Sequence, residues 1–234
     1  MRILFITSVE KEAQAIRSSP REGDGSMVVV SGVGRVNAAC AVTETILRHG
    51  PFDLVINAGI AGVLPASTPP GASRLTYPLA IGDVVLASRS VYAEEGLLTP
   101  AGFQDMAALG FPLGDFPGNA VPGHESTIER LRAALEAPST SGSAFSGFAV
   151  APIATVATCS GADDLALTIA ARTGALAEAM EGAAALHAAR RLGTPAIELR
   201  AISNTTGDRS RQRWNIPAAL EALGRAVRAV SDAL

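Results

Sequence analysis

The sequence predicts an α/β fold in which helices cover a central mixed, largely parallel sheet as a three-layer sandwich. Short apolar, β-branched runs alternate along the chain with stretches of helical periodicity that are rich in Ala, Leu, Arg and Glu. This alternation is typical of a buried sheet with helices on both faces. Of the 234 residues, 48% are hydrophobic and 18% are charged, so the chain can bury a sizeable core. We therefore expect a single domain over residues 1–234.

The predicted elements follow one another in a regular order. Strands are expected at residues 3–7, 27–31, 54–57, 84–88, 150–158 and 196–203. Helices are expected at residues 13–17, 35–48, 127–135, 162–172, 177–192 and 217–234. Three segments crowded with Pro, Gly and Ser are expected to be surface loops, namely residues 65–78, 111–123 and 138–147. Loops of this length are often binding loops, but insertions without function are equally common, so the sequence assigns them no role.

Composition limits the kinds of ligand and compartment that the chain suits. Lys and Arg number 19 against 22 Asp and Glu, a net charge of -3, so the basic surplus of a general nucleic-acid binder is missing. Lys11 is the sole lysine, which leaves little room for lysine-based catalysis. Cys40 and Cys159 cannot form a disulfide framework, and no apolar stretch approaches the ~20 residues of a membrane span. We expect a cytoplasmic protein that binds a small molecule and has neither a nucleic-acid nor a membrane partner.

Metal and covalent acyl chemistry find no support in the residue pattern. His49, His124 and His187 are scattered without the spacing of metal ligands, so no metal is assigned. Gly32 and Gly34 do not bracket a serine, as a nucleophile elbow requires.

Two glycine-rich turns are expected at the ends of predicted strands. Residues 31–35 read Ser-Gly-Val-Gly-Arg before a helix, and residues 57–62 read Asn-Ala-Gly-Ile-Ala-Gly after the third strand. Strand ends of open α/β sheets are where ligands bind, although each turn taken alone is equally well explained as structural. Asn37 stands where a dinucleotide fingerprint has its third glycine, which disfavours a Rossmann cofactor site.

Two acidic residues differ in what their surroundings imply. Glu12 lies just after the first strand, where a single carboxylate is most simply explained as compensating a helix dipole. Glu181 lies in an Ala-rich stretch that should be buried against the sheet, and burying a carboxylate without a partner is costly. Either a neighbouring donor or a ligand must satisfy Glu181, and the paired hydroxyls of a ribose would suit its two oxygens.

Polar residues gather where the last predicted strand ends. Residues 200–204 read Arg-Ala-Ile-Ser-Asn, and the following residues supply Asp208, Arg209, Arg211 and the single tryptophan, Trp214. For each arginine, a solvated charged loop explains the sequence as well as a binding site does.

Taken in order, these segments resemble the nucleoside phosphorylase and nucleosidase superfamily, in the branch of the 5'-methylthioadenosine/S-adenosylhomocysteine nucleosidases. The matching segments are residues 9–13, 31–39, 57–62, 81–85, 160–161, 180–182 and 200–204. The resemblance implies a nucleoside phosphorylase-like fold, no cofactor, and cleavage of an N-glycosidic bond through an oxocarbenium-like sugar. Relatives in this superfamily are commonly dimers, so a homo-oligomer is expected.

The resemblance also implies roles for single residues. Glu12 would activate or position the attacking water, and Glu181 would bind the ribose hydroxyls. Met180 would pack on the sugar, while Ala61 and Gly62 would line the site. Phosphorylases of the superfamily hold phosphate with an arginine in the turn after the third strand. Residues 56–59 here are Ile-Asn-Ala-Gly, which favours water as the nucleophile.

Asn204 departs from the pattern, because the adenine-specific nucleosidases carry Asp at this point. An amide can donate to purine N7 and to a 6-oxo group, but it cannot give up a proton as an acid. A 6-oxopurine such as hypoxanthine therefore fits better than adenine, with Ser203 beside Asn204 in the binding site. Whether Asp208 supplies the missing proton is left undecided by the sequence.

Residues 202–214 look like the corresponding segment of futalosine hydrolases of the menaquinone pathway, which release hypoxanthine from futalosine. The 5' substituent of futalosine ends in a benzoate, which Arg209 or Arg211 would pair with and Trp214 would stack on. The predicted function is hydrolysis of futalosine to hypoxanthine and dehypoxanthine futalosine. The alternatives are a 5'-methylthioadenosine/S-adenosylhomocysteine nucleosidase, a purine nucleoside phosphorylase with an unrecognised phosphate site, and a nucleoside-binding protein without catalysis.

Overall fold

The computed structural model describes residues 1–17, 25–65, 79–136 and 147–234. The strands are β1 Ile3–Thr7, β2 Met27–Val30, β3 Leu54–Val63, β4 Val84–Tyr92, β5 Gly96–Thr99, β6 Gly102–Asp105, β7 Ala120–Pro122, β8 Phe148–Thr155, β9 Ala177–Ala179 and β10 Ala196–Thr205. The helices are α1 Glu10–Ile16, α2 Arg35–His49, α3 Glu125–Glu136, α4 Asp163–Thr173, α5 Gly182–Arg191 and α6 Ile216–Ala233.

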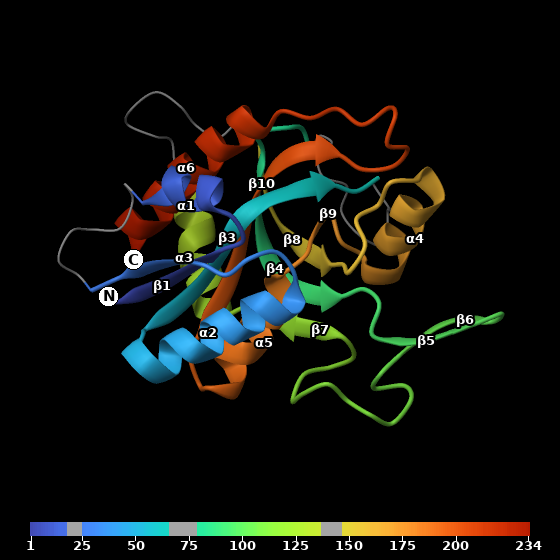
Figure 1. The fold of residues 1–234 in the computed structure, drawn as a ribbon, viewed down its shortest axis with the longest axis horizontal. Coiled ribbons are helices and arrows are strands. Elements are labelled where there is room, and N and C mark those ends of the chain that lie inside the picture. The colour runs from blue at the N-terminus through green and yellow to red at the C-terminus, as the bar shows by residue number, and fades with distance from the viewer. Residues whose placement is uncertain (18–24, 66–78, 137–146) are drawn as a thin grey trace.

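The larger sheet is mixed and partly closed on itself (Figure 1). The strand order β10–β4–β8–β9–β3 returns to its start because β3 also pairs with β10. Strands β1 and β2 continue in parallel from β3, whereas the β10–β4, β3–β9 and β4–β7 pairs are antiparallel. The predicted α/β class with a mixed sheet is confirmed. The three-layer sandwich is not confirmed in that form, because the closure through β10 curves the sheet.

Helices pack against both faces of this sheet, with α1, α3 and α6 on one side and α2 and α5 on the other (Figure 1). Strand β1 shows why its sequence is continuously apolar. Ile3 and Phe5 belong to the core under α1 and α6, while Leu4 and Ile6 belong to the core under α2 and α5. Because successive side chains of a strand point to opposite faces, a continuous apolar run buries both.

Two sequence-based predictions of local structure were wrong. Residues 57–62, expected to form a turn, lie inside β3, which continues to Val63 because β10 pairs along its whole length. The helix expected from residue 177 begins only at Gly182, and residues 177–179 form β9 between β3 and β8. Alanine has a high helix propensity, but propensity determines local structure only weakly, so strand pairing on both sides overrides it.

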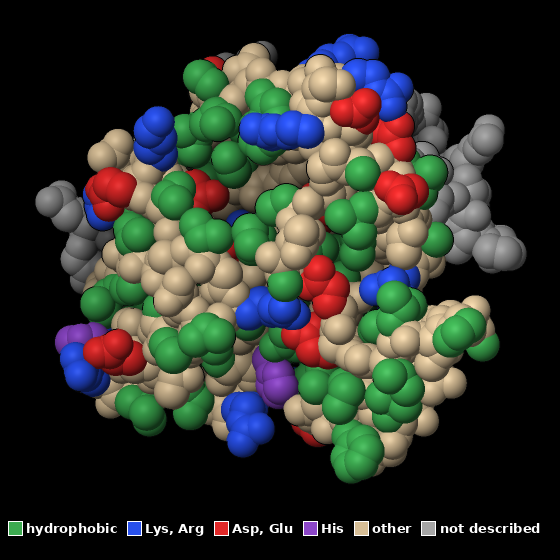
Figure 2. Space-filling model, turned by 45° about the vertical axis from the view of Figure 1, so that its right-hand side comes forward, with side chains coloured by type: hydrophobic (Ala, Val, Ile, Leu, Met, Phe, Trp, Pro, Cys, Tyr) green, Lys and Arg blue, Asp and Glu red, His purple; other side chains and the backbone are tan. Residues whose placement is uncertain are grey.

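The predicted loops differ in how far the structure describes them. Residues 111–123 are described and include β7, whereas the loops predicted at 65–78 and 138–147 lie almost wholly outside the described residues. Across the described parts of the chain, no helix is long and apolar enough to cross a membrane. Acidic and basic side chains are interspersed over the face shown in Figure 2, without a continuous basic surface there.

Candidate active site

A cavity of about 530 Å³ lies where β1, β3 and β10 end. It collects every predicted site residue except Arg211, namely Glu12, Ala61, Gly62, Met180, Glu181, Ser203, Asn204, Arg209 and Trp214. Glu178, Arg200 and Gln212, to which the sequence analysis assigned no role, line it as well.

Backbone amides from the turn between β1 and α1 and from β3 hold the Glu12 carboxylate. Oε2 accepts hydrogen bonds from the amides of Ser8 (2.8 Å) and Val9 (3.2 Å), and Oε1 accepts one from the amide of Ile60 (2.9 Å). The side chain is buried, so its oxygens are fixed at the floor of the cavity. An ionised carboxylate has about four acceptor sites, which leaves capacity for a water molecule.

The glycines of β3 provide space rather than a turn. A Cβ on Gly59 would lie 2.4 Å from Arg200 Nη1 and 2.7 Å from Glu12 Oε1. A Cβ on Gly62 would lie 3.0 Å from Asn204 Nδ2. The small residues therefore let polar side chains from α1 and β10 meet over β3.

Glu181 precedes α5, and its carboxylate accepts from three donors, one of which is the amide of Met180 at 3.3 Å. Its Oε1 accepts from the amide of Gly34 at 2.9 Å, and its Oε2 lies 3.3 Å from Arg200 Nη2. Gly34 has a φ of 99°, a conformation that glycine adopts without strain. The turn at residues 31–35 thus contributes a backbone donor to the site.

Arg200 is almost fully buried, with 1% exposure, and forms ion pairs with Glu181 and Glu198. Its Nε donates to Glu198 Oε1 at 2.9 Å, and its Nη2 donates to Asn57 Oδ1 and to Glu181. Burial alone would lower the pKa of Arg200, but Glu198, Glu181 and Glu12 offset this and the pKa is raised. Burial raises the pKa of Glu198, an effect that Arg200 opposes. The sequence did carry a sign of this pair, since two opposite charges stand two residues apart in an apolar strand.

Glu178 on β9 is a third buried carboxyl of the cavity. Its Oε1 accepts from the amide of Ser160 at 2.8 Å, and its Oε2 accepts from the Ser160 hydroxyl at 2.5 Å. Burial raises the pKa of Glu178, the bonds from Ser160 lower it in part, and the negative charge of Glu94 adds to the rise.

A β-bulge places Ser203 and Asn204 side by side in the cavity. The register of β10 against β3 shifts between Ile202 and Asn204, and such bulges redirect side chains. The Ser203 hydroxyl lies 2.8 Å from Asn204 Oδ1 and 3.1 Å from the carbonyl of Ala61. Asn204 Nδ2 donates to the carbonyl of Thr205 at 3.0 Å, which leaves its second hydrogen for a ligand.

The segment after β10 forms one wall of the cavity around Gln212. Its Oε1 accepts from Arg209 Nη1 (2.8 Å) and Trp214 Nε1 (3.0 Å), and its Nε2 donates to the carbonyls of Ser160 (3.0 Å) and Gly207 (2.9 Å). The Arg209 guanidinium lies 4.9 Å from the centre of the Trp214 ring. An isolated antiparallel bridge joins Trp214 to Asn204, so the wall closes on the strand it leaves.

The structure places Arg211 and Asp208 away from this wall. Arg211 is 68% exposed and pairs with Asp163 and Asp208. Hydrogen bonds from Ser210, together with Arg211, lower the pKa of Asp208 below its usual value. Neither side chain lines the cavity, so Asp208 does not stand where a proton donor to a bound ligand must be.

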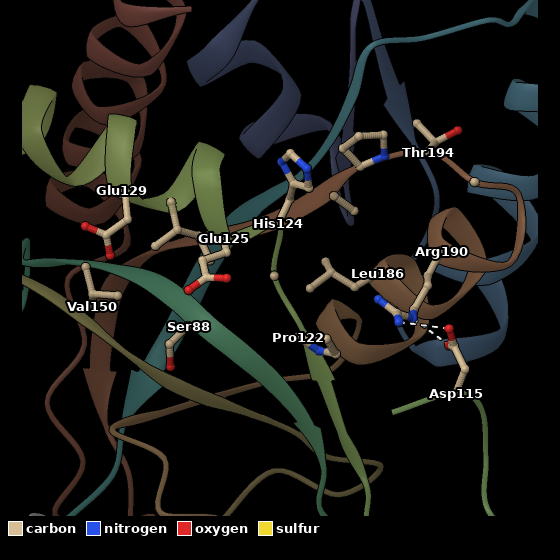
Figure 3. Close-up of a pocket in the computed structure, with 15 residues that line it drawn as sticks. Ser88, Asp115, Pro122, His124, Glu125, Glu129, Val150, Leu186, Arg190 and Thr194 are labelled. Atoms are coloured by element: carbon tan, nitrogen blue, oxygen red, sulfur yellow. Dashed lines mark hydrogen bonds and ion pairs between the residues drawn. The ribbon is translucent and has the colours of Figure 1, made fainter. Parts of the chain in front are cut away.

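A separate cavity of about 760 Å³ lies at the amino end of β10 (Figure 3). Its lining includes Glu125 and Glu129 on α3, and an Arg190–Asp115 ion pair stands at its margin. None of the predicted site residues lines this cavity.

Comparisons with known proteins show the family to which the chain belongs. The family model of the phosphorylase superfamily matches residues 21–233. The chain belongs to the phosphorylase superfamily. It is 32% identical over 247 residues to a futalosine hydrolase from Streptomyces coelicolor, covering 97% of this chain and 94% of that protein. It is 27% identical to a 5'-methylthioadenosine/S-adenosylhomocysteine nucleosidase from Colwellia psychrerythraea, covering 87% and 76% of the two chains.

A solved structure shows the same fold. The 5'-methylthioadenosine/S-adenosylhomocysteine nucleosidase from Neisseria meningitidis, in complex with methylthio-immucillin-A, superposes with a TM-score of 0.75 at 22% identity, and the match covers 100% of this chain and 99% of that one. The superfamily predicted from the ordered motifs is confirmed, and so is the predicted class of enzyme, the N-glycosyl hydrolases.

Replacing Arg200 with Met should destabilise the fold. The variant would leave Glu198 and Glu181 buried without their cation, and removing one partner of a buried ion pair costs about 3–5 kcal/mol. Denaturant unfolding followed by circular dichroism measures the change. Arg211→Met, which removes an exposed cation, should leave the unfolding midpoint where it is. Equal midpoints for Arg200→Met and the unaltered protein would show that the buried pair contributes nothing.

Proposed function

We propose that the protein hydrolyses the N-glycosidic bond of futalosine and releases hypoxanthine and dehypoxanthine futalosine, as a step of menaquinone synthesis. The observation that carries the proposal is one cavity that combines Glu12 and Glu181 with an amide at residue 204 and with Arg209 stacked on Trp214. The similarity to a futalosine hydrolase over nearly the whole chain supports it.

In the proposed mechanism, the two carboxylates act on the sugar. Glu181, oriented by Gly34 and Arg200, binds the ribose hydroxyls, with Met180 packed on the sugar. Glu12 holds a water molecule below C1' and takes its proton as the water attacks. Fixed positions matter because the oxocarbenium-like sugar forms only briefly and must meet the water at once.

Water is the proposed nucleophile because the buried cation of the cavity is already neutralised. Arg200 directs its Nε and Nη2 groups at Glu198, Asn57 and Glu181, so these donors are not available to a phosphate. A bound phosphate would also lie close to the carboxylates of Glu12 and Glu181, where like charges repel.

Recognition of the base is assigned to Asn204, with Ser203 fixing the amide. With Oδ1 held by the Ser203 hydroxyl, the free Nδ2 hydrogen is a donor. A donor suits N7 and the 6-oxo group of hypoxanthine and does not suit a 6-amino group.

Arg209 is the arginine assigned to the benzoate of the 5' substituent. It lines the cavity, and within the described parts of the chain no ion pair occupies it, whereas Arg211 is held by two aspartates outside. Trp214 presents an aromatic face beside it for the ring.

Two predictions about the wider context belong to the same proposal. A cytoplasmic location suits a small-molecule enzyme of this kind. A homo-oligomer would cover apolar side chains such as Val36 and Leu47 of α2, which are 76% and 71% exposed.

The proposal is tested by measuring free-base release from futalosine, inosine and 5'-methylthioadenosine, with and without phosphate. We expect hypoxanthine from futalosine at a rate that phosphate does not change. Adenine from 5'-methylthioadenosine as the main product would instead indicate a 5'-methylthioadenosine/S-adenosylhomocysteine nucleosidase. A rate that depends on phosphate would indicate a phosphorylase.

Glu12→Gln should abolish most of the activity while the protein still folds. The amide cannot take the proton of the attacking water, so kcat should fall about 10²–10⁴-fold. Thermal unfolding and futalosine turnover are measured on the same preparation. Turnover near that of the unaltered protein would remove Glu12 from the mechanism.

Arg209→Ala should raise KM for futalosine at least tenfold, since a charge-assisted bond of about 1.5–3 kcal/mol is lost. KM for inosine, which has no carboxylate, should change little. Arg211→Ala is the matched variant and should leave both constants as they were. If instead Arg211→Ala raised KM for futalosine and Arg209→Ala did not, the contact with the benzoate would be assigned to Arg211.

A further inference from the structure

The departing purine needs a proton, and the residues considered so far do not supply it. The amide of Asn204 has no acidic proton to give, and Asp208 lies outside the cavity. Leaving the base as an anion would make bond cleavage slow, so a general acid is to be sought among the groups that line the cavity.

Among the described residues, three carboxyl groups line the cavity, those of Glu12, Glu178 and Glu181. Glu12 accepts bonds from three backbone amides and is placed beneath the sugar, and Glu181 pairs with Arg200. Glu178 differs from both. It meets the amide and the hydroxyl of Ser160, and the described residues show no ion pair to it. Its raised pKa, caused first by burial, favours the protonated form that an acid requires.

Strand register places Glu178 and Asn204 on opposite sides of Gly62. Gly62 of β3 pairs with Glu178 on one side and with Asn204 on the other. Directly paired residues point to the same face of a sheet, and the two outer strands stand about 10 Å apart. Gly62 has no side chain to fill the gap between them, and all three residues line the cavity.

We propose that Glu178 is the general acid of the reaction and donates its proton to N3 of the departing purine. This inference rests on the proposed function. Asn204 takes the N7 and 6-oxo edge of hypoxanthine, so a group on the far side of Gly62 meets the opposite edge. At that edge N1 already carries a hydrogen, which leaves N3 as the ring nitrogen able to accept one.

The step balances with one water molecule. The water oxygen forms a bond to C1', the C1'–N9 bond breaks, and its electron pair goes to the purine. One water proton passes to Glu12, and the proton of Glu178 passes to N3. The Ser160 amide and hydroxyl remain as donors to the Glu178 carboxylate that results. Both carboxyl groups return to their starting states by proton exchange with solvent, and the base relaxes to its stable tautomer in water.

The test combines a residue change with a substrate change. Turnover is measured for the unaltered protein and for Glu178→Gln, each with futalosine and with 3-deazafutalosine, in which a C–H group replaces N3. Glu178→Gln should lower kcat for futalosine about 10²–10⁴-fold. The unaltered protein should suffer a comparable loss on the 3-deaza substrate. Glu178→Gln should lose only a few-fold more on that substrate, because the proton transfer is already absent.

An independent outcome overturns the inference. If the loss in kcat from Glu178→Gln and the loss from replacing N3 multiply when combined, Glu178 only anchors the segment at Ser160 and does not protonate N3. Glu221→Gln on α6, an exposed Glu, is the matched control and should leave all rates unchanged. Should Glu178→Gln unfold, Glu178→Asp serves in its place: a slower enzyme that keeps its sensitivity to loss of N3 supports the inference, and one without that sensitivity refutes it.

The result is separable from the proposed function. Failure of the unaltered protein to release hypoxanthine from futalosine refutes that function alone. The same four rates are then measured with the nucleoside that the protein does cleave and with its 3-deaza analogue. If the two fold-losses in kcat multiply there, the role of Glu178 is refuted.

Discussion

A single buried guanidinium holds the centre of this molecule together. Arg200 lies among the carboxylates of Glu12, Glu181 and Glu198, and its charge makes their burial tolerable. The surrounding sequence is shaped by this group. Gly59 must lack a side chain so that Arg200 can cross β3, and Gly182 must lack one because Glu198 occupies the space beside it. Glu12, Glu181 and Glu198 therefore share one electrostatic anchor, and a change at any of them alters the balance for the others.

Much of the fold could be predicted from the sequence. The order of β1, β2, β4, β8 and β10 with their intervening helices follows from apolar runs and helical periodicity, which are local properties. The pairing of β10 with both β3 and β4 could not be predicted, because it depends on contacts between residues far apart in the chain. Strand β9 could not be predicted either, because it forms only by pairing with β3 and β8. Its three residues resemble the sequence of the helix that follows them.

The candidate site shows a similar division. Glu12, Glu181 and Asn204 stand in motifs with a recognisable order, and the structure collects them in one cavity. The contributions of Glu178 and Gln212 depend on neighbours in other strands and loops, so no local pattern indicated them. For Arg200 the local sign was Glu198, two residues earlier in the same apolar strand. The sequence named both Arg209 and Arg211 as candidates. Only the structure distinguishes them, because Arg209 packs on Trp214 whereas Arg211 pairs with Asp163.

The bridge between Asn204 and Trp214 has a consequence for how such an enzyme can diversify. Residues 206–213 form a closed loop whose two ends are fixed at the cavity, one at Asn204 and one at Trp214. On the proposed function, changes of length or sequence within this loop would reshape the wall formed by Arg209 and Trp214, while Glu12 and Glu181, which other segments hold, would stay in place. Substrate range and catalytic power are thus separable traits in this architecture, open to independent selection.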